Sequence, residues 1–123
     1  MSVLLYATAE KGPGERLRAV VKTFVPEKNI ELLATIQSLS DRLREPKDAE
    51  DVAILLAANR DELGEFLSVS DLLSDLRIIL VLPDREDETV AKGHTLKPRF
   101  LSYGDSNFID VAAVLSKMLA SED

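Results

Sequence analysis

Two unbroken apolar runs decide the fold of this chain: Val52-Ala53-Ile54-Leu55-Leu56-Ala57 and Ile78-Ile79-Leu80-Val81-Leu82. Each run is short and is bounded by charged or turn residues. Strands of a parallel sheet have this character, because helices cover the sheet on both faces and bury every side chain. The two runs therefore predict two central strands of a parallel sheet.

Three further runs complete the predicted sheet. The run Val3-Leu4-Leu5-Tyr6-Ala7 is also solidly apolar, whereas residues 30–34 and 99–103 mix apolar with polar side chains. Mixed runs suit the edges of a sheet, where one flank is open to solvent. The order 2-1-3-4-5 places the two mixed runs at the edges, so we predict a flavodoxin-like α/β fold with this order.

Segments with helical spacing lie between and after the strands. Alternation of five strands and five helices predicts one three-layer (βα)5 domain that spans residues 1–123, with a break in the third helix near Ser68–Ser70. The segment 86–97 predicts only a short helix and a loop. The predicted N-terminal caps are Ser38 for the second helix, Asn59 with Glu62 for the third, and Asp105 or Ser106 for the last.

Composition excludes several classes of function. The chain has 15 Lys and Arg against 22 Asp and Glu, a net charge of −7, which argues against binding to nucleic acid or to an anionic membrane. It has no cysteine and one histidine, so we predict no metal site and no bound cofactor. The first residues lack the basic flank and long apolar stretch of a signal peptide, so a cytoplasmic protein is expected.

The length, the five βα units and the pattern of apolar and mixed strands resemble those of the receiver domain of bacterial response regulators. The resemblance implies an acidic pair after the first strand and a phosphoacceptor Asp after the third. It also implies Ser or Thr after the fourth strand and Lys after the fifth, which would bind the phosphoryl group beside Mg²⁺.

None of these receiver residues is present at the corresponding strand ends of this sequence. The strand ends read Tyr6-Ala7-Thr8-Ala9, Leu56-Ala57-Ala58-Asn59, Leu82-Pro83-Asp84 and Ser102-Tyr103-Gly104. The resemblance therefore implies a pseudo-receiver, which has the fold without the phosphotransfer and acts in signalling or regulation through protein contacts. A displaced carboxylate site at Asp61 or Asp84 stays open as an alternative.

A second class of function is a small-molecule binder that takes a nucleotide, flavin or metabolite in the crevice at the strand ends. The alternative interpretation is that the polar residues there are helix caps and solvated loops. Gly12 and Gly14 follow the first strand, but the motif of a phosphate-binding loop is incomplete. The candidate crevice residues are Thr8, Glu10, Asn59, Arg60, Asp61, Asp84, Arg85 and Tyr103.

Positive charge gathers just before the last strand of an otherwise acidic chain. The resemblance implies that the face made by the fourth helix, fifth strand and fifth helix contacts a partner protein or a second copy. Ordinary surface charge is the alternative interpretation. The candidate partner surface consists of Lys92, Lys97, Arg99, Phe100 and Tyr103.

Overall fold

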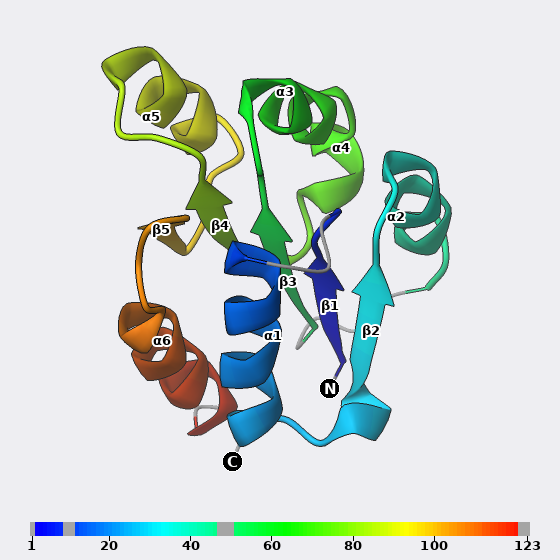
Figure 1. Cartoon of the computed structure of the whole chain (residues 1–123). Helices are drawn as coiled ribbons and strands as arrows, with labels where there is room; N and C mark the ends of the chain where they lie inside the picture. Colours follow the sequence, from blue (N-terminus) through cyan, green and yellow to red (C-terminus); the bar gives the residue numbers. More distant parts are fainter. Residues whose placement is uncertain (1, 9–11, 47–50, 121–123) are drawn as a thin grey trace.

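A five-stranded, all-parallel sheet forms the centre of the molecule, in the order β2-β1-β3-β4-β5 (Figure 1). The structure, a computed structural model, describes residues 2–8, 12–46 and 51–120. The strands are β1 (Val3–Tyr6), β2 (Ile30–Leu33), β3 (Val52–Leu56), β4 (Arg77–Leu82) and β5 (Phe100–Tyr103). The predicted flavodoxin-like fold and strand order are confirmed, and both mixed runs lie at the edges.

Helices cover both faces of the sheet. Helices α1 and α6 lie on one face and the remaining α-helices on the other (Figure 1). The helices are α1 (Pro13–Phe24), the 3₁₀ turn η1 (Glu27–Asn29), α2 (Ile36–Leu43), α3 (Arg60–Ser68), α4 (Ser70–Leu73), α5 (Asp87–His94) and α6 (Ile109–Ala120). None of the described helices has the length and apolar character that crossing a bilayer requires.

The core consists of two apolar layers separated by the sheet. In β1, Leu4 and Tyr6 pack toward α2 and α3, whereas Val3 and Leu5 pack toward α1 and α6. This division follows from the alternation of side chains along a strand. All five residues of β3 are buried, and so are the last five of β4, which explains why both runs are apolar throughout.

The N-terminus of α2 differs from the prediction. Thr35, not Ser38, is the N-cap, and its Oγ1 accepts a hydrogen bond from the Ser38 N–H at 3.1 Å. The Ser38 hydroxyl reaches back to the Thr35 N–H at 3.3 Å and closes a capping box. Both residues carry a hydroxyl, so the sequence identified the correct turn but not which of the two begins it.

The other helix boundaries confirm two predictions and correct one. The break near Ser68–Ser70 is present, since Val69 ends α3 and precedes α4, and a short helix, α5, occupies the segment 86–97. The last helix begins later than predicted, because the buried Phe108 has a φ of 64° and cannot be helical. Ser106 Oγ accepts from the Phe108 N–H at 2.9 Å, just ahead of the helix.

Candidate functional site

A cavity of about 200 Å³ lies at the carboxyl ends of the strands. Ligands of open α/β sheets bind at this edge, beside the point where the strand order reverses, which here is between β1 and β3. Its lining residues are mostly small and uncharged: Thr8, Pro13, Gly14, Leu56, Ala57, Ala58, Pro83 and Gly104. Each of them except Leu56 lies in a connection between a strand and a helix or at the start of α1.

The carboxylate of Glu62, in the first turn of α3, contacts two of the residues that line this cavity. Its Oε2 accepts a hydrogen bond from the Thr8 hydroxyl at 2.6 Å, and its Oε1 accepts from the Ala58 N–H at 3.0 Å. Thr8 and Glu62 are 54 residues apart, so the contact joins the ends of β1 and β3. Glu62 is thus fully engaged in tying two connections together.

Asn59 is the N-cap of α3, as predicted, and its Oδ1 accepts from the Glu62 N–H at 2.9 Å. The sequence pair Asn59 and Glu62 had indicated a capping box. In the structure the Glu62 side chain extends past the cap residue to Ala58 and Thr8. The position of Glu62, three residues after the N-cap, was therefore the sequence feature that marked this residue. Only the tertiary structure reveals that it contacts Thr8, just after β1.

Two ion pairs border the same edge of the sheet. Arg60 Nε lies 3.2 Å from Asp84 Oδ2, and Arg85 Nη1 lies 2.6 Å from Asp105 Oδ2. The Arg85 guanidinium also stacks on the Tyr103 ring, 4.3 Å from its centroid. Asp84 and Asp105 are therefore each balanced by an arginine.

The predicted crevice residues have separate roles. Glu86, and not Asp84, is the N-cap of α5. Asp84 Oδ1 accepts a hydrogen bond from the Glu86 N–H at 2.9 Å. Asp61 is exposed in the first turn of α3, where a carboxylate favours the positive end of the helix dipole. Asp105, predicted as a possible cap of the last helix, instead binds Arg85. Glu10 lies outside the described residues.

Tyr6 is a buried titratable group directly beneath this edge. Its ring is 1% exposed and packs edge-on against Phe66, with ring centroids 5.0 Å apart. Burial, together with the nearby Glu62 and Glu65 carboxylates, raises the pKa of Tyr6 to about 12. The neutral phenol is thus the form present at physiological pH.

The candidate partner residues do not all share one face. Phe100 packs with the core under α1 and α6, whereas Tyr103 packs with the core on the other side of the sheet. Their spacing of three along a strand requires this separation. Lys92, Lys97 and Arg99 are exposed, and Lys92 Nζ lies 3.3 Å from Glu88. Positive charge therefore lies in the connection from α5 to β5, at Lys97 and Arg99, whereas the charge of Lys92 is paired with Glu88.

In the ranges that the structure describes, no three His, Asp or Glu side chains gather closely enough to hold a metal ion. No protein-family model matches the chain, and no curated protein is significantly similar to it.

Removal of the α3 cap is expected to destabilise the fold. Asn59→Ala should lower the free energy of unfolding by about 1 kcal/mol, because the Glu62 N–H loses its acceptor. Asn59→Asp is the matched control, since aspartate caps equally well. Denaturant unfolding measures both variants. Equal losses in the two would contradict the capping role.

The Arg85–Asp105 ion pair predicts that the stability of the fold depends on pH. The Arg85 guanidinium holds the pKa of Asp105 below its usual value of 3.8. A carboxyl whose pKa is lower in the folded state adds stability above its unfolded pKa and loses it as the pH falls through the folded pKa. Arg85→Gln should raise the Asp105 pKa toward 3.8, measured by NMR titration of the carboxyl carbon, whereas Arg85→Lys should shift it less. An unchanged midpoint in Arg85→Gln would contradict the pair.

Proposed function

We propose that this chain is a pseudo-receiver, which acts in signalling or regulation through protein contacts and without phosphorylation of an aspartate. The observation that carries the proposal is the lining of the cavity at the strand ends. A receiver concentrates charge at that place, and here the lining is made of alanine, glycine, proline and one threonine beside a leucine.

Four positions support this interpretation, one after each strand that a receiver would use. Thr8 follows β1, Ala57 follows β3, Pro83 follows β4 and Gly104 follows β5, and all four line the same cavity. Ala57 is 1% exposed, and its N–H donates to the Val81 carbonyl at 3.0 Å. A methyl group cannot accept a phosphoryl group. Mg²⁺ requires oxygen ligands, whereas the side chains of Ala57, Pro83 and Gly104 have no oxygen and the Thr8 hydroxyl is bonded to Glu62.

Among the residues that the structure describes, the nearby carboxylates do not substitute for the missing ones. Glu62 is bound by Thr8 and Ala58, Asp84 by Arg60, and Asp105 by Arg85. A carboxylate that an arginine already neutralises is a poor ligand for Mg²⁺. Asp61 is exposed on α3 and is not among the residues that line the cavity. The geometry thus favours the pseudo-receiver over a displaced phosphorylation site.

The basic residues before β5 are the proposed contact with a protein partner. Lys97 and Arg99 are exposed cations on a chain whose net charge is −7, and Lys92, which is also exposed, is paired with Glu88. A local positive surface on an acidic molecule orients an acidic partner, since the rest of the surface repels it. Tyr103 lies on the same side of the sheet as α5 and adds an aromatic ring beneath Arg85.

Partner capture from the host tests this proposal. The tagged wild type should retain a specific protein, and a triple variant, Lys92→Glu with Lys97→Glu and Arg99→Glu, should lose it. A control triple variant, Lys22→Glu with Lys28→Glu and Arg44→Glu, changes the net charge equally elsewhere and should retain the partner. Equal capture by both triple variants, or none by the wild type, would overturn the proposed surface.

The cavity at the strand ends also supports a second candidate function, binding of a small metabolite. Its volume of about 200 Å³ is below the 300–1,000 Å³ that is usual for ligand pockets, and its lining offers few polar groups. A nucleotide or flavin is therefore a poor fit. A thermal-shift screen with nucleotides and flavins tests this alternative, and a clear stabilisation by one of them would favour it over the pseudo-receiver.

A further inference from the structure

The edge strand β2 has an unusual exposed surface. Leu32 is 50% exposed and lies on the side of the sheet that faces α1. Three of the four β2 residues are apolar, and the strand contains no proline, lysine or bulge. Native edge strands usually carry such features because they prevent pairing with another chain. The single charge, Glu31, is on the opposite side and is bound by Arg42 at 2.7 Å.

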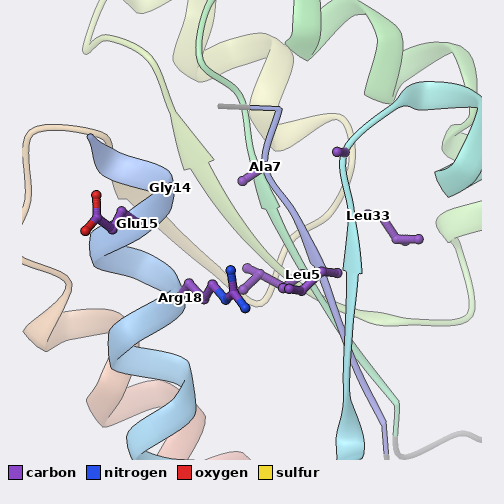
Figure 2. Close-up of a pocket in the computed structure, with 8 residues that line it drawn as sticks. Leu5, Ala7, Gly14, Glu15, Arg18 and Leu33 are labelled. Carbon is purple, nitrogen blue, oxygen red and sulfur yellow. The ribbon is translucent and has the colours of Figure 1, made fainter. Parts of the chain in front are cut away.

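A groove of about 190 Å³ runs beside this strand, between β2 and α1. Figure 2 shows Arg18 extending from α1 toward Leu5 of β1, with Ala7 just beyond that strand, whereas the Leu33 side chain of β2 points away from α1. Glu15, nearly one turn earlier on the same helix, also borders the groove. The floor of the groove is thus apolar, and its border carries one charge of each sign.

Within the part of the chain that the structure describes, no strand pairs with the outer side of β2 at Leu32. The Leu33 carbonyl accepts from the Ala7 N–H at 3.0 Å, so Leu33 directs its polar backbone groups toward β1. Successive residues in a strand direct these groups to alternate sides. Leu32 therefore directs its N–H and C=O outward. The outward N–H of Ile30, two residues earlier, is already donated to the Glu27 carbonyl within the chain.

We propose that a second copy of this chain pairs with β2 in antiparallel orientation, centred on Leu32. The two Leu32 residues then exchange both N–H···O=C bonds, and their side chains meet over the groove. In this register each Glu31 lies opposite Leu33 of the partner subunit, so the two acidic residues do not face each other.

A second copy fits this surface better than an unrelated protein does. A twofold axis requires a surface that is complementary to itself. Leu32 meets its own counterpart on an open strand edge, and the groove border pairs a negative Glu15 with a positive Arg18. A border of one sign would repel its copy, whereas mixed signs allow attraction across the axis. This interface is separate from the proposed partner surface near β5, at the other edge of the sheet.

Sedimentation equilibrium over a range of concentrations tests the dimer. The mass of the wild type should rise from 13.6 kDa toward twice that value. Leu32→Glu should raise the dissociation constant at least about tenfold, because it removes from each subunit a leucine that the dimer would bury. Ile109→Glu is the matched control, since Ile109 is 69% exposed on α6 and the charge change is the same. Leu32→Thr preserves strand propensity and should also weaken the dimer.

Amide hydrogen exchange locates the interface within the same protein. The Leu32 N–H should become protected as the concentration rises, while the N–H groups of Ile30 and Leu33, which are bonded within each chain, should not change. A wild type that stays monomeric at every concentration would overturn the dimer. A dimer that Leu32→Glu leaves intact, or one with an unprotected Leu32 N–H, would overturn the β2 interface.

Discussion

Replacement of Phe66 by alanine is expected to lower the free energy of unfolding by about 3–5 kcal/mol. The side chain is fully buried between α3 and the sheet, where it meets the Tyr6 ring edge-on at 5.0 Å. Its removal leaves a cavity and also ends the aromatic contact. Denaturant unfolding followed by circular dichroism measures the loss.

The matched control for this prediction is the same substitution at Phe24. That side chain is 42% exposed at the end of α1, so Phe24→Ala creates no closed cavity. Its cost should be well below that of Phe66→Ala. Equal costs would contradict the packing described for Phe66.

Introduction of a carboxylate at position 57 has the second largest expected effect. Ala57→Asp should destabilise the fold by about 2–4 kcal/mol at pH 7, because it places a charge at a buried position. The neighbouring Ala58 N–H is already donated to Glu62, so the Glu62 carboxylate lies close enough to repel the new one. Ala58→Asp, at an exposed position one residue later, is the matched control and should cost far less.

The pH dependence of Ala57→Asp has a definite sign. Burial and the Glu62 carboxylate both raise the pKa of the new group in the folded state above its unfolded value. The destabilisation should therefore be smallest at pH values below the unfolded pKa and should increase as the pH rises through the folded pKa. A loss of stability independent of pH would show that steric crowding, rather than charge, opposes a carboxylate at this position.

The sheet could be predicted because a strand that is buried on both faces has an unbroken apolar sequence. The wholly apolar β3 and β4, which is apolar after Arg77, lie in the interior of the sheet, and the mixed β2 and β5 lie at the edges. The caps of α2 and α3 were predictable to within a turn, since side chains with a suitable oxygen occur near the start of both helices. The start of α6 could not be predicted, because the apolar spacing that includes Phe108 gives no sign that this residue has a positive φ.

The candidate site was less predictable, because its contacts join residues distant in sequence. The Thr8–Glu62 hydrogen bond spans 54 residues, and Arg60–Asp84 spans 24. The sequence showed that the receiver's acidic residues are missing from the strand ends, but not that arginines would pair with Asp84 and Asp105. The opposite faces of Phe100 and Tyr103, by contrast, follow from strand alternation and could have been inferred from their spacing.

The measurement that tests the proposed function most directly is the intact mass of the protein after incubation with Mg²⁺ and a small phosphodonor. An active receiver domain treated in parallel shows that the conditions support phosphorylation. With Ala57 at the end of β3, and with no aspartate among the described residues that line the cavity, the mass should remain that of the unmodified chain. A stable increase by one phosphoryl group on an aspartate would contradict the pseudo-receiver.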